Sequence, residues 1–103
     1  MSLTGNENHG ITLTEAAVLT ANYRITHPGA IKGIYYGKQA MIGILTQDEC
    51  VGIRIYYAQD LLGNPTMVIT GVDSNGNDMH EGQLVEFGNP CPTLCSSSNP
   101  LNT

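Results

Sequence analysis

The stretch VGIRIYYAQDLLGNPTMVITGV, residues 51–72, decides the fold because it contains two strand-like runs joined by a short reversal. Side chains alternate in character over residues 51–58, as in a strand with one buried face. Residues 62–65 form the reversal, and residues 66–72 carry apolar side chains on both parities, as expected of a central strand. The sequence therefore predicts a central β-hairpin. The first-strand side chains predicted to face the helices are Val51, Ile53, Ile55 and Tyr57.

A third strand is predicted after the hairpin. Residues 73–78, DSNGND, are rich in turn-forming residues, and Asn-Gly is a strong signal for a tight reversal. Residues 83–87 then alternate again. The tail, residues 89–103, has three prolines, a serine run and no periodicity, so we expect an irregular segment packed on or trailing from the domain.

Two helices are predicted before the hairpin. Thr12 and Glu15 fit a capping box, in which each side chain satisfies a backbone N–H of the first turn. The helix they begin runs over residues 13–25 and ends before a Pro-Gly pair. Helical spacing returns over residues 38–47, and residues 30–37 between the helices suit an extended connector.

These elements predict an α+β fold, with two N-terminal helices packed on a three-stranded antiparallel β-meander and an irregular C-terminal tail. A chain of 103 residues suits one domain with one core. We expect residues 1–11 to be a flexible lead-in, residues 12–88 to form the single domain, and residues 89–103 to be the tail.

Charge is scarce in this chain and mostly negative. Charged residues make up 13% of the sequence, about half the usual share of roughly 25%, and the net charge is −5. The four basic residues are scattered, which argues against nucleic-acid binding and against anionic membrane surfaces. A surface so poor in charge favours self-association. The basic residues are Arg24, Lys32, Lys38 and Arg54.

The first ten residues contain neither the basic nor the apolar region of a signal peptide. No apolar run approaches the roughly 20 residues that a membrane-spanning helix needs. We therefore predict a cytoplasmic protein, in which thiols stay reduced.

Cys91 and Cys95 form a C-x3-C pair in the tail. Together with Cys50 and one of two histidines, they would supply the four ligands of a tetrahedral zinc site; the two histidines are His27 and His80. Because the spacing departs from the CxxC pairs of zinc and thiol-redox proteins, the sequence predicts no metal site and no cofactor. The favoured interpretation is that the three cysteines are small packing residues. A structural disulfide in the tail is the alternative for an exported protein.

Two other patterns resemble functional sites. Residues 73–78 resemble a calcium loop in composition, but glycine stands at the fourth position and no glutamate stands at the twelfth, so a hairpin turn explains them better. His80 beside Asp78 or Glu81 leaves a histidine–carboxylate acid/base pair open. No nucleophile elbow and no glycine-rich phosphate loop occurs in the sequence.

Arg54 is the one charge within the apolar first strand. Adjacent strand residues point to opposite faces, so Tyr56 joins Arg54 on the open face if Tyr57 is in the core. We interpret Arg54 as the cross-strand partner of Glu86 rather than as an anion-binding group. The predicted interaction surface comprises Arg54, Tyr56, Met67 and Ile69.

Four runs, KGIYYGK, CVGIRIYYA, VITGVDSNGND and PCPTLC, occur in this order from residue 32 onward. They resemble a family of small uncharacterised bacterial proteins. The resemblance covers nearly the whole chain after residue 12 and implies no activity, cofactor or catalytic residue.

The sequence leaves two functional hypotheses. The first is a small cytoplasmic binding or assembly module that forms a homodimer, or docks another protein, through the open sheet face. The second is a small-ligand or metal-binding protein, dependent on thiols, that uses the cysteine and histidine set. No motif indicates an enzyme.

Overall fold

The computed structural model describes residues 2–103, which divide into two compact units. The first, which we call the sheet unit, comprises residues 2–7 and 36–88. The second, the ribbon unit, comprises residues 8–35 and 89–103. The predicted domain over residues 12–88 therefore includes parts of both units. No helix in the described chain is long and apolar enough to cross a membrane.

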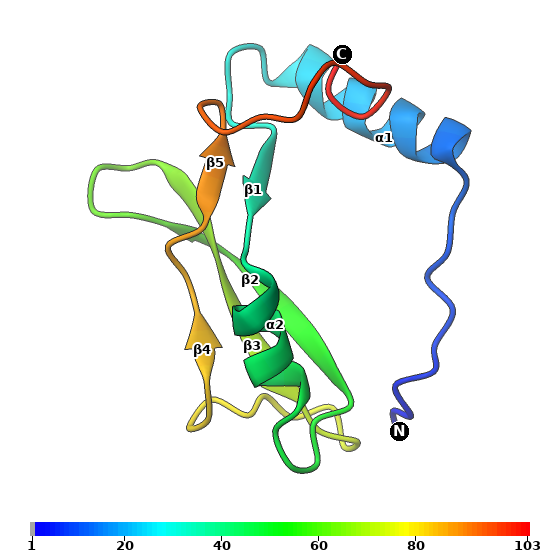
Figure 1. The fold of residues 1–103 in the computed structure, drawn as a ribbon, viewed down its shortest axis with the longest axis vertical. Coiled ribbons are helices and arrows are strands. Elements are labelled where there is room, and N and C mark those ends of the chain that lie inside the picture. The colour runs from blue at the N-terminus through cyan, green and yellow to red at the C-terminus, as the bar shows by residue number, and fades with distance from the viewer. Residues whose placement is uncertain (1) are drawn as a thin grey trace. The chain divides into compact units, whose positions relative to one another are not determined.

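The sheet unit contains the predicted meander (Figure 1). Its strands are β2 (Gly52–Gln59), β3 (Pro65–Val72) and β4 (Leu84–Val85), antiparallel in the order β2-β3-β4. The β2–β3 register runs without a bulge from Gly52 opposite Val72 to Gln59 opposite Pro65. The α+β class and the three-stranded antiparallel sheet are thus confirmed.

Helix α2 (Lys38–Leu45) covers one end of this sheet. Ile44 is fully buried, and Gly71 on β3 lies close to residues of the helix and of the segment after it. A Cβ atom at Gly71 would lie 2.9 Å from Gln47 Nε2 and 3.0 Å from Cys50 Sγ. The missing side chain of Gly71 therefore lets the end of the helical segment pack against the strand.

The two faces of the sheet follow from the register, because directly opposite residues in an antiparallel pair share a face. The face that α2 approaches, which we call the isoleucine face, comprises Ile53, Ile55, Tyr57, Met67, Ile69 and Gly71. The opposite face, which we call the arginine face, comprises Arg54, Tyr56, Val68, Thr70 and Val72. Ile69 and Val72 are buried on opposite faces.

One predicted burial is wrong. Ile53, Ile55 and Tyr57 lie on the face that α2 approaches, but they are 40%, 46% and 90% exposed. The reason is length: an eight-residue helix spans about 12 Å, whereas an eight-residue strand spans about 26 Å. Helix α2 therefore leaves much of β2 uncovered.

The ribbon unit holds α1 (Leu13–Thr26) and a two-stranded antiparallel ribbon of β1 (Gly33–Tyr35) and β5 (Asn89–Cys91). The predicted capping box is confirmed: Thr12 Oγ1 accepts from the N–H of Glu15, whose carboxylate accepts from the N–H of Thr12. Two expectations need correction. Only α2 belongs to the unit that holds the meander, and three tail residues form a strand because β1 supplies their partner.

We predict that Ile44→Ala lowers the free energy of unfolding of the sheet unit by about 2–5 kcal/mol, because it leaves a cavity under α2. Ile42→Ala on the same helix is the matched control, since that side chain is 38% exposed. It should cost about 1 kcal/mol. Urea unfolding followed by circular dichroism measures both, and equal losses would contradict the assigned helix face.

Candidate functional site

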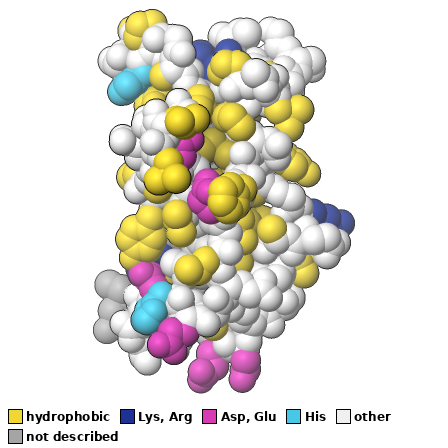
Figure 2. Space-filling view, turned by 90° about the vertical axis from the view of Figure 1, so that its left-hand side faces the viewer, with side chains coloured by type: hydrophobic (Ala, Val, Ile, Leu, Met, Phe, Trp, Pro, Cys, Tyr) yellow, Lys and Arg dark blue, Asp and Glu magenta, His cyan; other side chains and the backbone are white. Residues whose placement is uncertain are grey.

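Strand β2 forms an edge of its sheet and carries an unusual amount of open apolar surface. Ile53, Ile55, Tyr56 and Tyr57 are between 40% and 90% exposed. The turn that follows adds Leu61 and Leu62, which are 104% and 87% exposed. We call these six residues the β2 surface. Figure 2 shows hydrophobic side chains open to solvent on the face of the molecule that it presents.

The edge itself lacks the usual protection against pairing. Natural edge strands are short, bulged, or interrupted by lysine or proline. Strand β2 is eight residues long, its register with β3 is unbroken, and it contains neither lysine nor proline. Its one charged residue, Arg54, is paired with Asp78. Within residues 2–103 no strand pairs with its outer edge. Such an edge can accept another strand through its free backbone groups.

The sequence predicts that Arg54 pairs with Glu86, and this prediction is wrong. Arg54 pairs with Asp78. Its Nη1 donates to Asp78 Oδ1 at 2.5 Å and to the carbonyl of Gly76 at 3.2 Å. Glu86 instead accepts from the Thr66 hydroxyl at 2.5 Å. The sequence held a signal for this outcome. A reversal over residues 73–77 places Asp78 opposite Val72, on the arginine face.

Tyr56 completes this group by donating its hydroxyl to Asp78 Oδ2. This hydrogen bond is the main reason why the pKa of Asp78 is lowered, and Arg54 lowers it further. The same hydrogen bond raises the pKa of Tyr56. The three side chains keep the Asp78 carboxylate ionised and fix the turn against β2, so we assign the group a structural role.

The turn that presents Asp78 is a hairpin connection. The Asp73 carboxylate accepts from the backbone N–H groups of Asn75 and Asn77, both at 3.0 Å. This is the local bonding typical of an Asx turn. The predicted reversal is confirmed, and the calcium-like spacing is explained by the turn.

Met67 and Ile69 do not share a face with Arg54 and Tyr56, which corrects the predicted interaction surface. They lie on the isoleucine face, where Ile69 is only 3% exposed. The strand carries apolar residues on both parities because β3 is the central strand of the sheet. The Tyr36 hydroxyl donates a hydrogen bond to the backbone carbonyl of Met67 at 2.9 Å. Burial raises the pKa of the Tyr36 phenol.

The cysteine and histidine candidates do not form a site. Cys91 and Cys95 are joined by a disulfide, which corrects the expectation of reduced packing thiols and removes both thiolates as metal ligands. Cys50 is the free cysteine, and its thiol donates to the carbonyl of Gly52 at 3.2 Å. His80 belongs to the sheet unit, whereas His27 belongs to the ribbon unit. No group of three metal-ligating side chains occurs within residues 2–103.

The comparisons with known proteins assign no family. The chain matches no protein-family model, no curated protein and no solved structure. The resemblance to small bacterial proteins therefore stays a prediction.

The disulfide gives a direct prediction. Protein purified without reductant and then denatured should react with a thiol reagent at one cysteine, Cys50, and after reduction at three. Three reactive thiols before reduction would show that the Cys91–Cys95 bond does not form in solution. Mass spectrometry of the alkylated peptides identifies which cysteine reacted.

The Asp78 group gives a pH prediction. Because folding lowers the pKa of this carboxyl below 3.8, its stabilising contribution is complete above that value and is lost as the pH falls through the folded-state pKa. The melting temperature of the wild type should exceed that of Asp78→Asn by a constant margin above about pH 5, and the margin should shrink below about pH 3.8. Glu81→Gln is the control, and a margin independent of pH would contradict this role.

Proposed function

We propose that this protein is a binding and assembly module that pairs with a second copy of itself along the free edge of β2. The observation that carries the proposal is the eight-residue edge strand, which has four large, exposed side chains, no bulge, no lysine or proline, and one charge, Arg54, that is already paired with Asp78. Backbone hydrogen bonds would supply affinity, and the alternating side chains would supply specificity.

The sequence of β2 is self-complementary in the antiparallel direction. A two-fold axis at Ile55 sets Ile55 against its own copy and Ile53 against Tyr57 of the second copy, so apolar side chains meet on the isoleucine face. The same axis sets Arg54 against Tyr56 of the second copy rather than against a second arginine. Like charges therefore do not meet directly, and an arginine beside a tyrosine ring is a favourable pair.

Charge does not oppose this arrangement locally. Arg54 is the single charged residue of β2, and Asp78 already pairs with it. The contact would be small, with three exposed side chains per copy on the isoleucine face. Association costs several kcal/mol in lost freedom, so we expect dissociation constants in the micromolar range or weaker.

Sedimentation velocity tests the assembly. The wild type should show a reversible monomer–dimer equilibrium between about 1 μM and 1 mM, a range set by the expected affinity. Ile55→Lys should shift the protein to monomer, because it would place two lysines together at the two-fold axis. Leu84→Lys is the matched control: it lies on β4 at the opposite edge of the sheet, is 54% exposed, and should leave the equilibrium unchanged.

Hydrogen exchange separates edge pairing from other contacts. Outward-facing amides of β2 should gain protection as the concentration rises, and Ile55→Lys should abolish the gain. A wild type that stays monomeric throughout the range would overturn the proposal, as would a dimer that Leu84→Lys disrupts and Ile55→Lys does not.

A further inference from the structure

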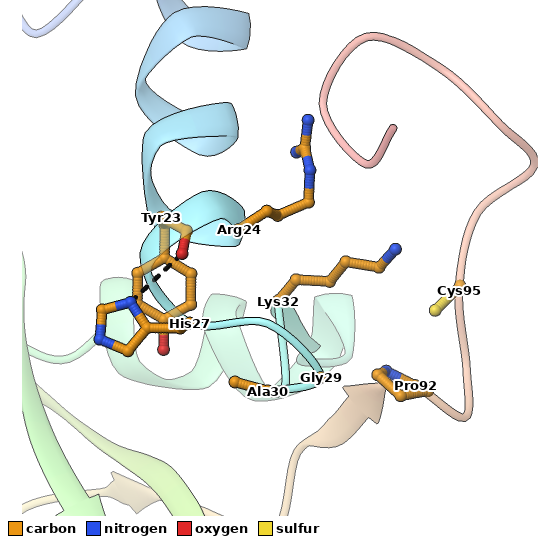
Figure 3. A pocket seen from close by; sticks show the side chains of 8 residues that line it. All are labelled: Tyr23, Arg24, His27, Gly29, Ala30, Lys32, Pro92 and Cys95. Carbon is orange, nitrogen blue, oxygen red and sulfur yellow. Dashed lines mark hydrogen bonds between the residues drawn. The ribbon is translucent and has the colours of Figure 1, made fainter.

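The ribbon unit contains a cavity of about 280 Å³ that has no part in the proposed assembly. It opens where the C-terminal end of α1 and the loop after it meet the residues that follow β5 (Figure 3). The side chains of interest around it are Tyr23, Arg24, His27 and Lys32. This volume is near the lower end of the range for small-molecule sites, so a ligand here would be small.

Positive charge is concentrated at this cavity in an otherwise acidic chain. The ribbon unit holds two basic residues, Arg24 and Lys32, and one acidic residue, Glu15. The other eight acidic residues and two basic residues belong to the sheet unit, so formal charges of +1 and −6 give the total of −5. The Glu15 carboxylate is engaged at the first turn of α1, and Arg24 is in its last turn.

The two cations extend from neighbouring parts of the ribbon unit on the side where the tail lies (Figure 3), and they bond to consecutive residues of the tail. Arg24 Nη1 donates to the carbonyl of Leu101 at 2.6 Å, and Lys32 Nζ donates to the carbonyl of Asn102 at 3.0 Å. Within residues 2–103, neither has a carboxylate within 4.0 Å, since the ion pair found there is Arg54–Asp78. A guanidinium has five donors and an ammonium three, so each retains most of its capacity.

Aromatic rings form another part of the wall. The rings of Tyr23 and His27 stack with centroids 4.2 Å apart and planes 11° from parallel. His27 Nδ1 lies 3.2 Å from the Tyr23 carbonyl and 2.9 Å from Thr26 Oγ1, which fixes the imidazole. The cavity therefore combines a rigid ring surface with two cations that lack carboxylate partners.

We infer that this cavity binds a small organic oxyanion, with Arg24 and Lys32 holding its carboxylate or phosphate group. Arginine offers a planar fork that matches two oxygens of either group, and lysine adds a point charge. The stacked rings suit an apolar or aromatic body on the anion. The contacts to the tail carbonyls are compatible with this role, because they occupy one donor of each cation.

Titrations followed by ¹⁵N NMR test the site in the whole chain. The probes are benzoate, phenyl phosphate and inorganic phosphate, at constant ionic strength set with chloride. Saturable shifts are expected at residues 23–32, 92–95 and 101–102. Binding of benzoate alone would identify a carboxylate site, and binding of phenyl phosphate alone would identify a phosphate-ester site. If inorganic phosphate binds as tightly as phenyl phosphate, the stacked rings contribute nothing to the binding.

Variants assign the binding to the two cations. Arg24→Gln and Lys32→Gln should each weaken binding at least tenfold, whereas Lys38→Gln, a matched loss of positive charge in the sheet unit, should change it less than twofold. Lys32→Arg should bind with an affinity within about threefold of the wild-type affinity, because it keeps the positive charge. If the resonances of residues 101 and 102 keep their positions in the ligand-free glutamine variants, the loss of affinity does not come from a loosened tail.

The wild-type titration decides the location even where a variant loosens the tail. Absence of saturable shifts with all three probes up to about 20 mM, a concentration that exceeds the Kd of a weak site, would overturn the inference. So would shifts that saturate outside the cavity, or binding that survives both glutamine variants.

Discussion

The unbroken eight-residue ladder between β2 and β3 is the constraint on which the sheet unit depends. Its register assigns every side chain of the hairpin to a face, since a slip of one residue would exchange the two faces completely. It sets Gly71 beside the end of the α2 segment, where a side chain would collide. It also sets Asp78, one turn further on, on the face of Arg54. Packing and charge pairing therefore follow from the same ladder.

A second consequence of this ladder is that the sheet is longer than its cover. Helix α2 has eight residues and protects the end of the sheet near Gly71, where Ile44 is fully buried. Toward the other end of β2, Tyr57 is 90% exposed. A strand with this much open surface and a free edge is costly to leave alone, because it invites pairing with other strands. A specific partner along β2 would cover this edge and its exposed side chains and so prevent non-specific pairing.

The sequence predicted the local secondary structure well, but it predicted poorly which strand side chains are buried by other elements. The capping box located the start of α1, and alternation with turn residues located the hairpin and its register-setting reversals. Period-two alternation shows that the two faces of a strand differ, but not how much of either face other elements cover. The exposure of Ile55 could therefore not be predicted from the sequence. Three-residue strands such as β5 carry too little periodicity to detect. Finding the partner of Arg54 requires counting through the turn to Asp78. The disulfide contradicts the interpretation of the cysteines as packing residues, which rested on how often free cysteines are buried and on the expected compartment.

The ribbon unit is held together by few contacts, and this links its stability to its cavity. No residue of α1 is buried, and a two-stranded ribbon of three residues a strand is marginal alone. The Cys91–Cys95 bond closes only a short loop, and hydrogen bonds from Arg24 and Lys32 join the end of the tail to the rest of the unit. Both cations also line the cavity. An anion that bound both cations only in the folded unit would, by linkage, also stabilise the folded tail.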